Sequence, residues 1–154
     1  MSRPSGDELL VSDMEELAAA GVSILVSMID DDELPLEGLI DESLAAPFAG
    51  LRFIHVPTPD QQPPASTSGL LQLLAELARD VNRGSHLAVH CHAGHGRSPA
   101  FAAGVLVMAG FGPDDAMSAL SRARGRSVPH REAQRAWVYG VYEQIVMQGF
   151  NPTG

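Results

Sequence analysis

Hydrophobic residues along the chain fall into two patterns, one typical of helices and one typical of buried strands. Apolar side chains recur every three or four positions over residues 7–20, which predicts an amphipathic helix. Further helices are expected over residues 37–49, 67–84, 99–109, 113–124 and 130–148. Buried strands are predicted by three short apolar runs, at residues 22–26, 51–56 and 87–89. Because strands alternate with helices, the expected fold class is α/β, with a mostly parallel central sheet flanked by helices.

Prolines and short polar segments mark the loops between these elements. Four prolines within eight residues around Asp60 predict a stiff, non-helical loop whose only acid is that aspartate. Thr67 or Ser68 is expected to cap the long helix that follows. The acidic run at residues 30–33 is interpreted as a solvated loop, because it lacks the alternating ligand spacing of a calcium loop. Residues 1–6 are polar and are expected to be flexible.

Composition narrows the class of protein. The chain has 154 residues, of which 45% are hydrophobic, so a single domain over residues 1–154 with its own core is expected. A net charge of −9 argues against nucleic acid and membrane surfaces as partners. The single cysteine excludes an internal disulfide and fits a reducing cytoplasm. The first residues do not resemble a signal peptide, and no apolar run approaches the length of a membrane span.

That single cysteine, Cys91, lies in a glycine-containing loop between the third predicted strand and the helix that follows it. Backbone N–H groups that curl toward a helix N-terminus form a nest for a phosphate-sized anion. Arg97 offers a planar guanidinium that grips two phosphate oxygens, while Gly94 and Gly96 permit the tight curl. The positive field of such a loop lowers the pKa of a thiol, and Ser98 is placed to donate a hydrogen bond to the thiolate. Without these neighbours, a lone cysteine would be interpreted as an inert core residue.

Residues 91–98 read Cys-x5-Arg-Ser, with a histidine directly before the cysteine. This pattern resembles the signature of the cysteine-dependent protein tyrosine and dual-specificity phosphatases. The compact chain looks like the small atypical dual-specificity or kinase-associated-phosphatase-like members of that superfamily. The resemblance implies a phosphotyrosine-phosphatase-like fold and hydrolysis through a phosphocysteine intermediate. It implies no cofactor and no metal ion.

The resemblance also assigns roles to individual residues. The Cys91 thiolate attacks phosphorus, and Ser98 supports the thiolate. Asp60 protonates the leaving oxygen and then acts as base toward water, which agrees with its position in a loop after a predicted strand. The phosphate oxygens are held by the loop, at His92, Ala93, Gly94, His95, Gly96 and Arg97. Outside this context, Asp60 would be interpreted as a turn residue beside prolines.

Gln134 has two interpretations. Many members of the family use a glutamine near the start of the last helix to place the attacking water, and Gln134 lies at such a position. The alternative is a glutamine on the surface of that helix. Both interpretations are compatible with the sequence.

Histidines crowd around the cysteine. His90, His92 and His95 could suggest zinc, but they lack the paired spacing of zinc ligands, so no metal site is predicted. In the resemblance, His90 orients the loop. Inositol-lipid phosphatases of the superfamily often carry lysines at the positions of His92 and His95, so this chain matches them only in part.

The function predicted first is a phosphoprotein phosphatase with a shallow cleft, acting on phosphotyrosine and also on phosphoserine and phosphothreonine. A phosphatase for inositol phosphates, phosphoinositides or another small phosphomonoester is the second enzyme interpretation. A catalytically silent phosphate-binding module is a third, although such modules commonly lose one of the reacting residues. An arsenate reductase or sulfur transferase would leave Asp60 without a role. The expected partner is therefore a phosphorylated protein or small phosphomonoester, and no sequence feature indicates an oligomeric state.

Overall fold

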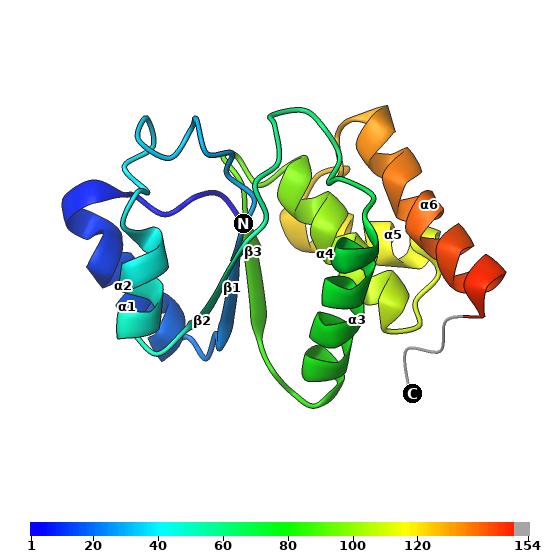
Figure 1. Ribbon diagram of the computed structural model, residues 1–154, viewed down its shortest axis with the longest axis horizontal. Helices are drawn as coiled ribbons and strands as arrows, with labels where there is room; N and C mark the ends of the chain where they lie inside the picture. The colour runs from blue at the N-terminus through cyan, green and yellow to red at the C-terminus, as the bar shows by residue number, and fades with distance from the viewer. Residues whose placement is uncertain (150–154) are drawn as a thin grey trace.

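The computed structural model describes residues 1–149, and helices alternate with strands along them (Figure 1). The strands are β1 (Ile24–Ser27), β2 (Arg52–His55) and β3 (Leu87–His90). The helices are α1 (Leu10–Ala19), preceded by a 3-10 turn at Asp7–Leu9, α2 (Glu42–Phe48), α3 (Ser68–Asn82), α4 (Arg97–Met108), α5 (Pro113–Arg124) and α6 (Glu132–Gln148). The predicted α/β class is confirmed.

The sheet is parallel throughout, with strand order β2-β1-β3. In the register of the sheet, Ile24 lies beside Arg52 on one side and Leu87 on the other. Strand β1 is therefore central, and all four of its residues are buried. A strand covered on both faces reads as a continuous apolar run, which is the pattern that predicts it from the sequence.

Two layers of helices cover the sheet, with α1 and α2 on one face and α3 to α6 on the other (Figure 1). Alternate side chains of a strand point to opposite faces. Ile24, Val26 and Met28 accordingly belong to the core beneath α3, α4 and α6, whereas Leu25 and Ile29 belong to the core beneath α1 and α2. The two cores therefore pack against opposite faces of one sheet.

The helix boundaries follow local chemistry. Thr67 is the residue that caps α3, since its Oγ1 accepts a hydrogen bond from the N–H of Leu70 at 3.2 Å. Helix α2 begins at Glu42, five residues later than predicted. Gly38 has a φ of +67°, a left-handed backbone conformation that prevents the helix from starting earlier. None of the helices over residues 1–149 is long and apolar enough to cross a bilayer.

Residues 1–6 pack against the body of the protein, which differs from the flexible start that their composition predicts. The N–H of Arg3 donates to the carbonyl of His92 at 3.0 Å, and the Arg3 side chain forms an ion pair with Glu37. Pro4 and Gly6 are buried. The segment is thus held by contacts with the loop after β3 and with the loop between β1 and α2.

Candidate active site

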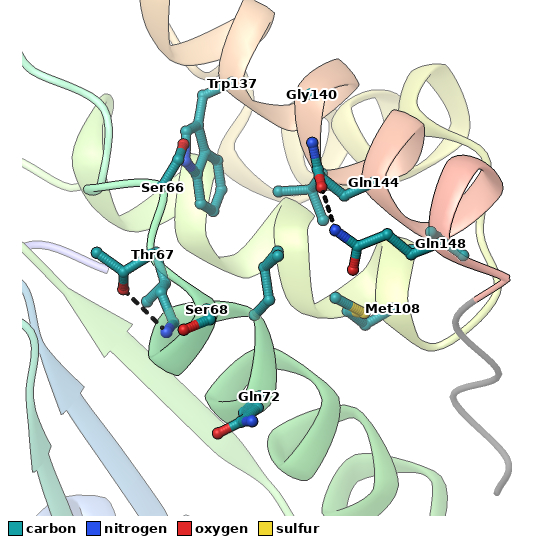
Figure 2. Close-up of a pocket in the computed structure, with 13 residues that line it drawn as sticks. Ser66, Thr67, Ser68, Gln72, Met108, Trp137, Gly140, Gln144 and Gln148 are labelled. Atoms are coloured by element: carbon teal, nitrogen blue, oxygen red, sulfur yellow. Dashed lines mark hydrogen bonds between the residues drawn. The ribbon is translucent and has the colours of Figure 1, made fainter.

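A cavity of about 510 Å3 lies between α3, α4 and α6, and Figure 2 shows the residues that line it. Trp137 and Met108 form apolar parts of its wall, and the Gln148 amide donates to the Gln144 side chain at 2.7 Å. No Asp, Glu, His, Lys, Arg or Cys side chain lines it. Titratable side chains instead gather in a separate cavity, where the strands end.

The carboxyl ends of the three parallel strands meet at one edge, and α/β proteins bind ligands at such edges. A cavity of about 260 Å3 lies there, and four candidate residues line it: Cys91, Arg97, Asp60 and Gln134. His92, Ala93, His95 and Gly96 line the same cavity. The fold thus brings the cysteine loop together with the proline loop after β2 and the start of α6.

Two glycines give the loop after β3 its shape. Gly94 has a φ of +75°, and a Cβ there would lie 2.5 Å from the carbonyl group of Met1. Gly96 has no unusual φ, but a Cβ there would lie 2.9 Å from the side-chain amide of Gln134. Gly94 is therefore required by backbone conformation as well as by space, and Gly96 by the close approach of α6.

Cys91 lies at the base of the loop and is 3% exposed. Burial opposes ionisation of its thiol, but three other effects outweigh it. The Ser98 hydroxyl lies 3.2 Å from Sγ, the N–H groups of Ser98 and Gly94 point toward the sulfur, and the Arg97 charge is close. Together they lower the pKa of Cys91 below its ordinary value.

Arg97 is the first residue of α4, and its side chain is 2% exposed. Its guanidinium donates to the carbonyl of Thr58 at 2.8 Å and of Met28 at 3.4 Å. Nη1 and Nη2 also donate to the two carboxylate oxygens of Glu33, at 2.5 and 3.0 Å. Burial works against the charge of Arg97, yet the pairing with Glu33 dominates and raises the pKa of the guanidinium.

Glu33 is a site residue that the sequence analysis missed, because it placed residues 30–33 in a solvated loop. The residue follows the central strand β1, so its loop leaves the sheet at the same edge as Cys91. Partial burial opposes ionisation of Glu33, but the hydrogen bonds from Arg97 lower the pKa of its carboxyl. Position after the central strand is a signal that residues 30–33 share, and only the contact with Arg97 separates Glu33 from the other three acids.

Asp60 lies at the mouth of the cavity, and 65% of its side chain is exposed. Its Oδ1 is 3.4 Å from Nη2 of Arg97 and accepts a hydrogen bond from the N–H of Gln61 at 2.9 Å. Gln61 has a φ of +64°, which turns the chain sharply after the acid. The carboxyl of Asp60 is thus presented to the same space as the Cys91 thiol.

Gln134 is completely buried, which excludes the surface interpretation. Its Nε2 donates to the carbonyl of Gln62 at 3.3 Å, while its Oε1 has no hydrogen-bond partner within residues 1–149. A buried carbonyl oxygen without a partner is unfavourable unless a solvent molecule or ligand satisfies it. Since Gln134 lines the cavity, this oxygen is available to a bound water molecule.

The three histidines near the cysteine have separate partners. Nε2 of the buried His90 lies 2.5 Å from Oε1 of the equally buried Glu42, which ties the end of β3 to α2. Nδ1 of the exposed His92 lies 2.9 Å from Glu37. His95 is contacted by Arg126. Over residues 1–149, no group of three or more His, Cys, Asp or Glu side chains is arranged to hold a metal ion.

Three solved phosphatase structures are similar in fold to this chain. A kinase-associated phosphatase with its catalytic cysteine replaced by serine superposes with a TM-score of 0.81 at 19% identity, covering 94% of this chain and 85% of that one. Tk-PTP in its active form gives 0.71 at 25% identity, covering 88% and 87%. PTPMT1 in complex with PI(5)P gives 0.73 at 19% identity, covering 97% and 92%. The phosphotyrosine-phosphatase-like fold is confirmed.

Sequence comparison identifies the family. No curated protein matches the chain. The model of a family described as "Polymorphic toxin system, DSP-PTPase phosphatase" matches residues 1–111. The matched segment contains the Cys91 loop, Asp60 and Glu33. Because this match covers well over half of the chain, the protein belongs to the DSP-PTPase phosphatases of polymorphic toxin systems.

Proposed function

We propose that the protein hydrolyses phosphomonoesters of proteins through a phosphocysteine intermediate. The observation that carries this proposal is the Cys91 thiol, whose pKa is lowered within a loop that also presents Arg97 and faces Asp60. A thiolate is a nucleophile, whereas an inert buried cysteine stays protonated. Lowering of this pKa despite burial therefore favours chemistry over a structural role.

In the first step, Sγ of Cys91 attacks phosphorus, and the bond from phosphorus to the leaving oxygen breaks. Asp60 in its protonated form donates its proton to that oxygen, so the leaving group departs as an alcohol or phenol. The loop N–H groups and the Arg97 guanidinium hold the remaining phosphoryl oxygens. Stabilising charge on these oxygens is the main source of catalysis in phosphoryl transfer, and no step needs a metal ion.

In the second step, water attacks phosphorus and the bond from phosphorus to sulfur breaks. Asp60, now a carboxylate, takes a proton from the water. The unpartnered Oε1 of Gln134 orients this water by accepting its second hydrogen. Inorganic phosphate leaves, the Cys91 thiolate is restored and Asp60 regains its proton.

Phosphotyrosine is the first substrate we assign, with phosphoserine and phosphothreonine reached through the open mouth around Asp60. A phosphoinositide is the second candidate, favoured by the likeness to PTPMT1, which was solved with PI(5)P. His92 weighs against it, because its partner is the carboxylate of Glu37, which repels additional phosphates.

We assign residues 1–154 to one domain, since both cores share the sheet. We place the enzyme in a reducing compartment such as the cytoplasm, where a catalytic thiol stays reduced.

The test is hydrolysis of an aryl phosphate near pH 6, with a reductant and a chelator present, by the wild type and Cys91→Ser. Turnover that disappears in the variant supports a cysteine phosphatase, and a trapped phosphocysteine after rapid acid quench identifies the intermediate. Asp60→Asn is expected to lose far more rate on poor leaving groups than on good ones, because only poor ones need the proton. Equal losses on both would remove Asp60 as the acid.

A further inference from the structure

Exposed apolar side chains gather in the part of the fold that contains α1 and α2. Six of the eleven large apolar side chains that are exposed over residues 1–149 come from residues 9–48. They are Leu9, Val11, Leu36, Ile40, Leu44 and Phe48. Single exposed apolar residues are ordinary on protein surfaces, whereas a contiguous patch of them marks an interaction site.

Four of these side chains line one open hollow of about 670 Å3. Val11 comes from α1 and Ile40 from the loop between β1 and α2, while Leu44 and Phe48 come from α2. Ile40, Leu44 and Phe48 are 63%, 70% and 80% exposed. Helices α1 and α2 lie on the opposite side of the sheet from α3 to α6 (Figure 1), so the hollow opens to solvent and not toward those helices. We call it the α1–α2 groove.

Helix α2 arranges its side chains in the reverse of the usual order for a surface helix. The small residues Ala45 and Ala46 are buried in the core, while the larger Leu44 and Phe48 are exposed. A surface helix normally buries its large apolar residues and exposes polar ones. Packing within this fold therefore does not require Leu44 and Phe48 to be apolar, whereas a partner that covers them would.

The segment that forms the groove is strongly acidic. Residues 4–51 contain twelve of the chain's 19 acidic residues and no lysine, arginine or histidine. The rest of the chain has ten arginines and seven acidic residues, so its own balance is positive. Asp7 and Asp41 are exposed and line the groove directly. The negative charge of the protein is therefore concentrated in the segment that carries its largest group of exposed apolar side chains.

This charge selects the occupant of the groove. A second copy of the chain would bring two acidic segments together, and an anionic membrane surface would be repelled in the same way. A helix that presents apolar side chains to the groove, with lysines or arginines beside them, satisfies both the apolar surface and its acidic rim. We propose that the α1–α2 groove is a docking site for a partner protein that presents a basic amphipathic helix.

The groove is separate from the active site but shares a loop with it. None of the residues that line the groove also lines the cavity that holds Cys91. The loop between β1 and α2 contributes Ile40 to the groove, and the same loop contributes Glu33, which binds Arg97. Docking is measured by binding and needs no turnover, so its test does not depend on the proposed function.

The test uses three synthetic peptides of about 18 residues, or five turns of helix. The first has leucines on one helical face and lysines on the other, the second has the same composition in scrambled order, and the third has glutamates in place of the lysines. Fluorescence anisotropy of each labelled peptide, titrated with the full chain at about 0.15 M salt, gives Kd. The first peptide is expected to bind at least about tenfold more tightly than the other two, as for burial of one large apolar side chain.

Substitutions in the groove test where the first peptide binds. Leu44→Ser and Phe48→Ser are each expected to raise its Kd by about tenfold to a hundredfold. Asp7→Asn combined with Asp41→Asn should raise Kd by about twofold to tenfold and make binding less sensitive to salt. Phe111→Ser removes an exposed phenylalanine between α4 and α5 and should keep the wild-type Kd. All these side chains are exposed, so circular dichroism and urea unfolding of each variant should match the wild type.

Four results would overturn the inference. No binding of the first peptide, or equal binding of the scrambled one, would reduce the groove to diffuse negative charge. Binding that survives both Leu44→Ser and Phe48→Ser would place the peptide elsewhere. A dimer in light scattering that becomes a monomer in Phe48→Ser would assign the groove to a second copy. Binding to phosphatidylcholine vesicles that Phe48→Ser abolishes would assign it to a lipid surface. Each of these results leaves aryl phosphate turnover, and with it the proposed function, untouched.

Discussion

Glu33 binds the Arg97 guanidinium through both carboxylate oxygens, at 2.5 and 3.0 Å, from a loop that follows the central strand. Arg97 has its remaining bonds to main-chain carbonyls, including that of Thr58. The guanidinium is therefore oriented before any phosphate binds, and a planar group that is already oriented loses little entropy on binding. Glu33 acts as a positioning residue, since it reaches the substrate only through Arg97.

Glu33→Gln is expected to reduce kcat/KM on an aryl phosphate by about tenfold to a hundredfold, the worth of a charge-assisted hydrogen bond at a buried guanidinium. The affinity for vanadate or phosphate should fall, whereas the pH midpoint of Cys91 alkylation should change little. The reason is that Glu33 contacts Arg97 and not the thiol. Asp32→Asn removes an exposed acid from the same loop and serves as the control. An equal loss in Asp32→Asn would point to the charge of the loop instead of the pairing.

The same pair makes folding stability depend on pH. The folded-state pKa of Glu33 lies below its ordinary value of 4.5, so its contribution to the free energy of unfolding is fully present above that value. It is lost as the pH falls through the folded-state pKa. Urea unfolding of the wild type and Glu33→Gln from pH 7 down to pH 3 should therefore converge at the acidic end. A difference that stays constant over this range would show that Glu33 stabilises the fold by packing alone.

Elements with short-range signals were predicted well from the sequence. Hydrophobic spacing places every helix and strand in order, and boundary differences such as the later start of α2 arise from one glycine with a positive φ, Gly38. Cys91 and Arg97 lie in one loop, so their pairing needs no knowledge of the fold. Asp60 is far from them in sequence, and it was predicted from the family resemblance together with the expectation that parallel strands end at one edge.

Residues whose role depends on a distant partner were harder to predict. Glu33 lies in a run of four acids, and only its contact with Arg97 separates it from Asp30, Asp31 and Asp32. The burial of Gln134 depends on how α6 packs over Gly96. Pairing across the fold is set by packing, and hydrophobic periodicity carries no information about it.

Ser98→Ala is expected to raise the pKa of Cys91, because the Ser98 hydroxyl at 3.2 Å is the strongest of the contacts that lower it. The pH midpoint of iodoacetamide alkylation should move upward, and kcat/KM near pH 6 should fall by about tenfold, as for the loss of one hydrogen bond to a charged group. Ser12→Ala changes an exposed serine on α1 and controls for the substitution. A wild-type midpoint near the ordinary thiol value would contradict the activated thiolate itself.

Gly104 and Gly140 offer a matched pair of helix glycines for testing the core. A Cβ on Gly104 in α4 would lie 2.9 Å from the Trp137 ring and 3.3 Å from Leu74, whereas nothing lies within 4 Å of a Cβ on Gly140 in α6. Gly104→Ala should lower the free energy of unfolding by about 1–3 kcal/mol through overpacking. Gly140→Ala should raise it by about 0.5–1 kcal/mol, because alanine loses less backbone entropy in a helix.

Urea unfolding of the two variants measures both signs, and a double substitution tests the cause. If the Trp137 ring is the obstacle to Gly104→Ala, adding Trp137→Leu should make the combined loss smaller than the sum of the two single losses by about 1 kcal/mol or more. If the two losses of unfolding free energy add strictly, α4 accommodates the added methyl group without pushing against α6. In that case the contact between these helices would not hold Gln134 over Gly96, and Gly104→Ala should leave kcat unchanged. If the two losses are instead non-additive, α4 presses on α6, and Gly104→Ala should lower kcat because the start of α6 shifts.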